Sequence, residues 1–180
     1  MSSRRAGVLA LLLAAGAAGA SLFVSSSVFE RMPHVEDEFA NLWQAEVMAR
    51  GRLWIESPAA AESFLVPFVV DHEGRRFGKY PPGWPAALSL GAAAGAPFVV
   101  NALLMALVVW WTYRLGSRLA GHGPGLLAAL LAAGSPMMLM LSGSLMSHLL
   151  TVMLTLTFTW LGSICFPRRV SSPACRRGCW

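Results

Sequence analysis

Three stretches of this sequence contain no Asp, Glu, Lys or Arg, and each is long enough to cross a lipid bilayer. They cover residues 6–29, 84–113 and 123–166. A helix rises about 1.5 Å per residue and the hydrocarbon core is about 30 Å thick, so about 20 apolar residues make one crossing. With 56% hydrophobic and 13% charged residues, the composition excludes an ordinary soluble domain. It predicts an all-α integral membrane protein.

The lengths of these stretches predict about four transmembrane helices. The last stretch is about twice as long as one crossing needs, so it must fold back, with a turn at Ser142-Gly143-Ser144. Gly134-Ser135-Pro136 marks a point where the helix before that turn can loosen. Gly95-Ala96-Pro97 divides the middle stretch into a short re-entrant helix and one span, although two separate crossings are the alternative. The predicted spans are 6–29, 98–115, 124–141 and 148–166, with the re-entrant helix at 84–94.

Three groups of arginines decide between four and five crossings. They are Arg4 with Arg5, Arg114 with Arg118, and Arg168 with Arg169. Four crossings place all three groups on one side of the membrane, as the positive-inside rule requires, whereas five would place the second group outside. We therefore expect a multi-pass protein of the plasma (inner) membrane, with both termini in the cytoplasm.

The acidic residues agree with this orientation. All nine Asp and Glu residues lie between Glu30 and Glu73, so the loop 30–83 is expected to be one extracytoplasmic region. Within it, Phe39, Leu42, Trp43 and Val47 recur at the spacing of one helix face. This predicts an amphipathic helix on the outer membrane surface, which ends near Gly51.

The same helix begins with the acids Glu36, Asp37 and Glu38. Acids at a helix start stabilise the helix by ~0.3–1 kcal/mol each and need no other role. Three adjacent like charges beside a membrane span nevertheless make Asp37 and Glu38 candidates for catalysis. A carboxylate that accepts a proton typically contributes ~10²–10⁴-fold to a rate.

A basic element, RRFGKYPPGWP, follows these acids and leads back to the membrane. Its side chains Arg75, Arg76, Lys79 and Tyr80 are candidates for binding a substrate, because a leaving phosphate needs positive charge nearby. The alternative for Lys79 is that it only reaches out to lipid headgroups. His148, at the second outer turn, is a further substrate-binding candidate, since ionisable groups near membrane depth are usually functional. A neutral His148 bonded to Ser144 or Ser147 is the alternative, and Asn101 is expected to bond a neighbouring helix.

The cysteines and the end of the chain carry less information. Cys165, Cys175 and Cys179 lie on or after the last span, on the reducing side, so neither a disulfide nor a zinc site is expected. Residues 167–180 form a basic segment that we expect to be disordered, and its composition suggests a shifted reading frame.

Taken in order, these motifs resemble the N-terminal third of the GT-C membrane glycosyltransferases. The resemblance is to bacterial relatives of protein O-mannosyltransferases and of the lipid A aminoarabinose transferase, and covers roughly residues 6–163. It rests on Asp37-Glu38 followed by NLWQAEVMARGRLW, then on GKYPPGWPAALSLGAAAGAP, VVNALLMALVVWWTYRLGSRLAG and LLAALLAAGSPMMLMLSGSLMSHLLTVML.

The resemblance implies transfer of a sugar from a polyprenyl-phosphate donor to an unknown extracytoplasmic acceptor. It places Asp37 at the reaction centre with Glu38 beside it, and Lys79 at the phosphate of the carrier. Many relatives have another acid in the second outer loop, where this chain has Ser147-His148. A metal site with two carboxylates is therefore not expected, and a divalent cation is the only cofactor left open. The expected partners are the lipid-linked donor and membrane lipids, not nucleic acid.

Such transferases usually have many more spans, so the chain is expected to be a truncated member, inactive alone or dependent on a partner. The alternative is a small non-catalytic multi-span protein, either a scaffold or a transporter subunit. Its acidic outer loop would then bind cations or another protein.

Overall fold

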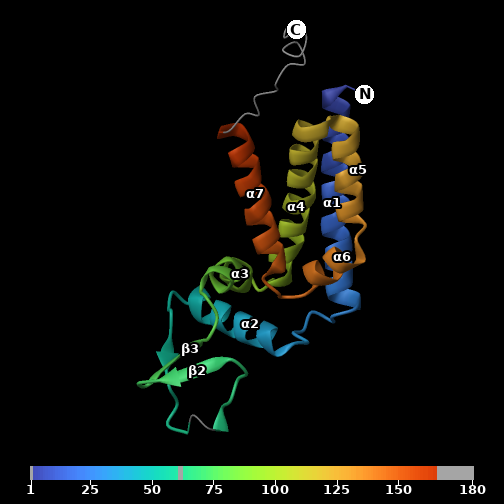
Figure 1. Ribbon diagram of the computed structural model, residues 1–180. Helices are drawn as coiled ribbons and strands as arrows, with labels where there is room; N and C mark the ends of the chain where they lie inside the picture. The colour runs from blue at the N-terminus through green and yellow to red at the C-terminus, as the bar shows by residue number, and fades with distance from the viewer. Residues whose placement is uncertain (1, 61–62, 166–180) are drawn as a thin grey trace, which may run out of the picture.

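The computed structural model describes residues 2–60 and 63–165, and it contains a bundle of long helices that ends in a smaller outer layer (Figure 1). The predicted tail 167–180, with Cys175 and Cys179, lies outside the described residues. The elements follow the chain in this order: α1 (Ser3–Ser27), α2 (Glu36–Ala49), β1 (Ile55–Glu56), β2 (Val69–His72), β3 (Arg75–Gly78), α3 (Gly83–Ala93), α4 (Phe98–Ala120), α5 (His122–Ala133), α6 (Pro136–Gly143) and α7 (His148–Cys165).

Within the described residues, α1, α4 and α7 are each long and apolar enough to cross a membrane. The pair α5 and α6 passes the same test together, but the two helices are bent by 55°. The predicted span 124–141 is therefore not one continuous helix. Gly134 ends α5, and Ser135 caps α6, whose first residue, Pro136, has no N–H group to satisfy.

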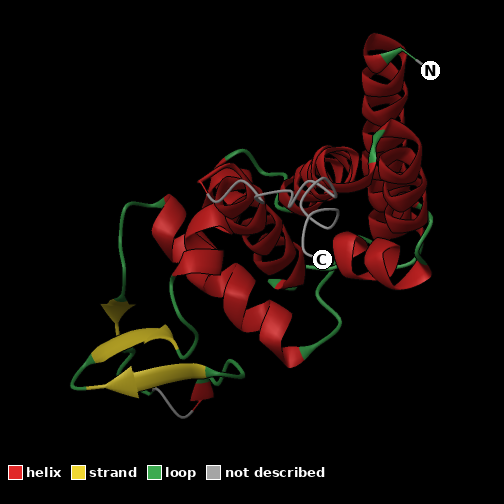
Figure 2. Cartoon of the chain, turned by 45° about the horizontal axis from the view of Figure 1, so that its top comes forward, coloured by secondary structure: helices red, strands yellow, loops and turns green. Residues whose placement is uncertain are grey.

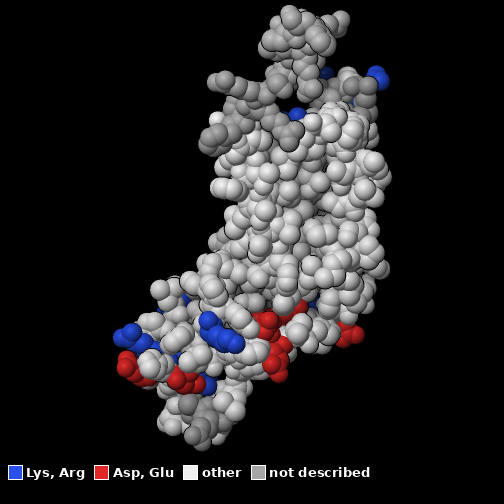
Figure 3. All heavy atoms as spheres, viewed as in Figure 1, with Lys and Arg blue, Asp and Glu red and all other residues white. Residues whose placement is uncertain are grey.

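Four segments form the bundle: α1, α4, the bent pair of α5 and α6, and α7. They alternate in direction, so Ser3 and the end of α7 lie at the same end of the molecule (Figure 1). On the face seen in Figure 3, a tall band of white, uncharged surface covers the bundle, with acidic and basic atoms gathered beyond its lower end. This is the shape expected of an even number of crossings. The middle stretch, residues 84–113, contains the short helix α3 before α4. The 11 residues of α3 are too few to span a bilayer, so this helix does not fit the alternative of a second crossing there.

Small side chains let α1 approach its neighbours closely. Its buried positions are Ala6, Ala10, Ala14, Ala17, Ser21 and Ser25. The Ser21 hydroxyl donates a hydrogen bond to the Ser142 carbonyl oxygen at 3.0 Å. Larger residues such as Leu12 and Phe23 are exposed on the outside. Helices in lipid gain little from burying apolar surface, so close packing and hydrogen bonds of this kind hold them together.

The helix α4 lies at the centre of the bundle and packs against α1, α5 and α7. The amide nitrogen Nδ2 of Asn101 donates to the carbonyl oxygens of Ser144 and Met146, at 2.6 and 3.1 Å. Asn101 was expected to bond another helix, but its acceptors belong to the segment that joins α6 to α7. Asn101 thus anchors that segment to the bundle.

The outer layer consists of α2 and α3, which pack against each other across the end of the bundle, and a small sheet beyond them (Figure 2). The sheet is antiparallel with strand order β1-β3-β2. Glu73 and Gly74, both with positive φ, form the two-residue turn between β2 and β3. The chain is mostly helical as predicted, but a prediction of helices alone omitted this sheet, because strands of two to four residues are too short to show a periodic pattern.

Candidate functional site

The predicted catalytic residue Asp37 lines a cavity of about 250 Å³ where the outer layer meets the bundle. We call it the Asp37 cavity. Its walls come from the start of α2, from the segment leading into α3, and from the first turns of α7. The lining residues are Asp37, Asn41, Tyr80, Pro81, Gly83, Trp84, Met146, Ser147, Leu150, Thr151 and Leu154.

Tyr80 holds the Asp37 carboxylate in place. Its phenolic oxygen donates a hydrogen bond of 2.6 Å to Oδ1 of Asp37. This bond to the carboxylate, together with desolvation, raises the pKa of Tyr80 to about 12. The Tyr80 ring also meets the ring of Phe68 edge-on, with centroids 5.7 Å apart. Among the described residues, Oδ2 of Asp37 has no hydrogen-bond partner, so it remains available to accept a proton.

The other predicted catalytic acid, Glu38, lies behind the cavity rather than in its wall. Its side chain is fully buried. Its oxygen Oε2 accepts from the backbone N–H of His34 at 2.8 Å, and Oε1 accepts from the backbone N–H of Leu145 at 3.3 Å. The first of these bonds closes the N-terminus of α2, as a glutamate at the third helical position often does. The two neighbouring acids therefore have different surroundings.

Leu145 is the point where three elements meet. Its N–H donates to Glu38 of α2, and its carbonyl oxygen accepts from Nε1 of Trp84 in α3 at 2.9 Å. Asn101 of α4 holds the carbonyls on either side of it. These bonds fix the segment 144–147, which carries Ser147 into the wall of the Asp37 cavity.

The helix α2 turns its polar residues toward the protein. Glu38, Asn41 and Gln44 are buried, whereas Phe39 is 46% exposed and Leu42 and Trp43 are half-buried. Gln44 is satisfied at both ends of its amide: Nε2 donates to the Leu53 carbonyl at 2.9 Å, and Oε1 accepts from the Gly78 N–H at 2.6 Å. Phe39, Leu42 and Trp43 were predicted to face the membrane; Phe39 is exposed, as that requires, whereas Leu42 packs against the buried core.

Val47 does not share that outward face. It was grouped with Phe39, Leu42 and Trp43 in the predicted apolar face, but its side chain is only 5% exposed. Of the four residues of the predicted apolar face, only Phe39 is therefore exposed.

The predicted cations occupy three different environments, and none of them lines the Asp37 cavity. Arg76 is buried in the sheet and donates to both oxygens of Asp71, with its Nη2 2.8 Å from Oδ2. These hydrogen bonds lower the pKa of Asp71. Arg75 lies over the ring of Trp54, 4.6 Å from its centroid.

Lys79 is exposed, and its Nζ lies 4.3 Å from the centroid of the Phe68 ring and 5.5 Å from that of Tyr80. Its backbone N–H donates to the Phe68 carbonyl. The lysine is thus one residue from Tyr80, which lines the cavity, and its ammonium group lies over the Phe68 and Tyr80 rings. His148 is exposed at the first turn of α7, adjacent to Ser147 but outside the cavity lining.

Sequence reasoning missed several residues that line the Asp37 cavity, chiefly Asn41, Trp84 and Thr151. A weak signal existed for two of them. Asn41 lies one helical turn after Asp37, and Thr151 lies one turn after Ser147, so each shares a face with its partner. Trp84 gave no such signal, and its indole N–H bonds the Leu145 carbonyl oxygen inside the protein.

The cavity offers a single carboxylate, that of Asp37. Among the described residues, no group of three or more His, Cys, Asp or Glu side chains is placed to hold a metal ion. The donor set in the cavity suits hydroxyl groups and a proton rather than a dedicated cation cage. The cavity therefore combines one carboxylate, which can accept protons or hydrogen bonds, with apolar side chains of α7.

Comparisons with protein-family models, with curated proteins and with solved structures found no match. The functional assignment therefore rests on the residues and geometry described above.

Proposed function

We propose that this chain is a membrane glycosyltransferase, or its donor-binding part, that resembles the GT-C enzymes. It would transfer a sugar from a polyprenyl-phosphate donor to an acceptor outside the cytoplasm. The observation that supports this best is the position of Asp37, whose carboxylate lines a cavity shared with apolar residues of a transmembrane helix. A donor with a lipid tail and a polar head needs a site that has both apolar and polar side chains in its lining.

In this proposal Asp37 is the general base that takes a proton from the acceptor hydroxyl. Tyr80 donates its hydrogen bond to Oδ1 of Asp37, which fixes the carboxylate. Oδ2 is then left for the hydroxyl of the acceptor. Asn41, Ser147 and Thr151 supply hydrogen-bonding groups for sugar hydroxyls along the same wall. Glu38, buried and bonded to two backbone N–H groups, acts as a positioning residue that keeps α2 and Leu145 together.

The lipid tail of the donor would follow α7. Leu150 and Leu154 line the cavity, and most of the α7 surface is open to the surroundings. The phosphate of the donor would meet Lys79, which is exposed beside Tyr80 and has no carboxylate partner among the described residues. Arg76 is already paired with Asp71, so it supports the sheet rather than the phosphate.

The proposed orientation places the outer layer outside the cytoplasm of the plasma (inner) membrane. Arg4, Arg5, Arg114 and Arg118 then lie on the cytoplasmic side, as the positive-inside rule requires.

Substitution of Asp37 tests the proposal directly. Membranes containing the protein are incubated with radiolabelled polyprenyl-phosphate mannose or aminoarabinose, and transfer of the label is counted. Asp37→Asn should lower transfer ~10²–10⁴-fold while donor binding, measured by photocrosslinking, is kept. Glu36→Gln is the matched control, because Glu36 is an exposed acid one residue away, and it should keep full activity.

Lys79→Ala separates binding from chemistry in the same assay. It should weaken crosslinking to the donor, whereas Arg75→Ala should not. If wild-type protein neither binds nor uses the donor, or if Asp37→Asn leaves transfer unchanged, the catalytic proposal is rejected. The alternative of a non-catalytic multi-span scaffold or transporter subunit would then be favoured.

A further inference from the structure

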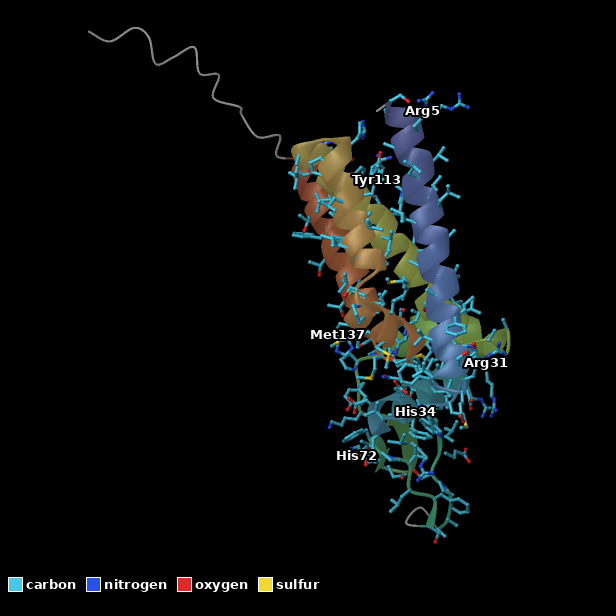
Figure 4. The ribbon with its side chains drawn as sticks, turned by 90° about the vertical axis from the view of Figure 1, so that its right-hand side faces the viewer. Arg5, Arg31, His34, His72, Tyr113 and Met137 are labelled. Carbon is cyan, nitrogen blue, oxygen red and sulfur yellow. The ribbon has the colours of Figure 1, made fainter. Side chains whose placement is uncertain are left out.

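A second polar cavity lies at the opposite end of the bundle from Asp37. Its volume is about 410 Å³, and its walls come from α1, α4, α5 and α7. We call it the arginine cavity. Figure 4 shows Tyr113, which lines it, near the upper end of the bundle below Arg5. Its functional side chains are Trp110, Tyr113, Arg114, Arg118, His122 and Trp160.

The two guanidinium groups of this cavity have no acid to neutralise them. Every Asp and Glu of the chain lies between residues 30 and 73, which belong to the outer layer or to the segments around it. Among the described residues, ion pairs occur only within the sheet region. Arg114 and Arg118 are both exposed, so their positive charge is open to an anion from outside the chain.

The arginines are nevertheless held in place by neutral contacts. Nη2 of Arg118 donates to the Ser163 carbonyl oxygen at 2.9 Å, which ties α4 to α7. The guanidinium carbon of Arg114 lies 5.8 Å and 5.9 Å from the ring centroids of Trp110 and Trp160. Such contacts orient a guanidinium without cancelling its charge.

A third donor is built into the same wall. The hydroxyl of Tyr113 and Nδ1 of His122 are 3.2 Å apart, and Tyr113 is almost fully buried. When the tyrosine donates this bond, the imidazole carries its proton on Nε2, which has no partner among the described residues. The cavity then presents two guanidinium groups and one N–H to the same space.

We propose that the arginine cavity binds the headgroup of an anionic phospholipid. A guanidinium matches the geometry of a phosphate and can donate two parallel hydrogen bonds to it. Basic pockets between transmembrane helices at the cytoplasmic face are typical sites for anionic headgroups, and tryptophans are enriched at that depth. This inference depends on the membrane placement of the bundle and is independent of the proposed transferase activity.

The test compares lipids retained by the purified chain in native mass spectrometry. The chain is released from micelles that contain equal amounts of phosphatidylglycerol and phosphatidylcholine. Wild-type protein should retain phosphatidylglycerol preferentially. Replacing both arginines (Arg114→Gln with Arg118→Gln) should lower that retention at least about tenfold, since a charge-assisted hydrogen bond to the phosphate contributes roughly tenfold or more.

The matched control is Arg4→Gln with Arg5→Gln. These two arginines lie at the same end of the bundle but do not line the cavity, so retention should change less than about twofold. An equal loss in both double variants would show general surface attraction and overturn the proposal. A third variant, Trp110→Leu with Trp160→Leu, keeps both arginines and should weaken retention only in part. Partial retention by this variant would show that changing side chains of the cavity does not by itself unfold the protein.

Two further outcomes would also overturn the proposal. One is equal retention of phosphatidylcholine and phosphatidylglycerol by the wild-type chain. The other is complete displacement of the lipid by inorganic phosphate, which would assign the cavity to a free anion.

Discussion

Asp37 and Glu38 are adjacent in the sequence and look equivalent there, but the structure separates their surroundings. One helical position turns a side chain by about 100°, so neighbours on α2 face different directions. Asp37 faces Tyr80 and the cavity, while Glu38 is buried against the backbone of His34 and Leu145. The pair thus consists of one acid that lines a cavity and one that is buried and holds two backbone N–H groups.

The hydrogen bond between Tyr80 and Asp37 predicts an unusual titration. The pKa of Tyr80 is raised to about 12, above its ordinary value of about 10. The stability that this bond contributes is therefore fully present below about pH 10 and is lost as the pH rises through about 12. The pKa of Tyr80 is measured from the ultraviolet absorbance of its phenolate as the pH rises. The measurement uses Tyr113→Phe protein, in which Tyr80 is the single tyrosine.

In the same protein, Asp37→Asn should bring the pKa of Tyr80 back toward its ordinary value, because the acceptor no longer carries a charge. Glu36→Gln should leave most of the increase, since Glu36 contributes less than Asp37. An unchanged pKa in Asp37→Asn would mean that the hydrogen bond does not form in the membrane.

At the level of elements, the contact between α4 and α5 depends on two glycines. A Cβ placed on Gly125 would lie 2.6 Å from the Ser117 nitrogen and 3.0 Å from the Tyr113 carbonyl oxygen, and one placed on Gly116 would lie 2.9 Å from the Cα of Gly125. Both contacts are with backbone atoms, which cannot move aside without separating the helices. This close approach explains how the two helices can turn back on each other within the short connection at Gly121.

We therefore expect Gly125→Ala to destabilise the protein by about 1–3 kcal/mol, as overpacking of a tight contact does. Gly162→Ala is the control, because a Cβ at Gly162 meets nothing within 4 Å. An alanine in that helix should be neutral or stabilise it by up to about 1 kcal/mol. Unfolding in mixed micelles, followed by circular dichroism, compares the two variants. Equal stability of both would contradict the packing of α4 on α5.

For the whole molecule, the alternating direction of the helices places the acidic outer layer and the arginine end at opposite ends of the bundle, which predicts that they lie on opposite faces of a membrane (Figure 1). In a chain with its native cysteines replaced by serine, Glu36→Cys should react with an impermeant maleimide in intact cells. Arg5→Cys should react only after the cells are permeabilised. The reverse pattern would reject both the orientation and the proposed reaction outside the cytoplasm.

The sequence alone determined the helices of the bundle, because a bilayer sets the length of each apolar segment that crosses it. The positive-inside rule likewise relates the Lys and Arg residues next to a span to the cytoplasmic side. The predicted spans at α1, α4 and α7, the short helix α3, the break at Gly134-Ser135 and the start of α2 at the three acids all agree with the structure. Each of these features is local, and a run of consecutive residues is enough to specify it.

Only the tertiary structure decided which side chains meet. Tyr80 reaches Asp37 across 43 positions, and Leu145 reaches Glu38 across 107. The burial of the polar face of α2 likewise depends on a partner far along the chain, since Gln44 bonds Gly78 across 34 positions. Such contacts carry no periodic signal in the sequence. Their hydrogen bonds are favourable only once packing has excluded water from both partners.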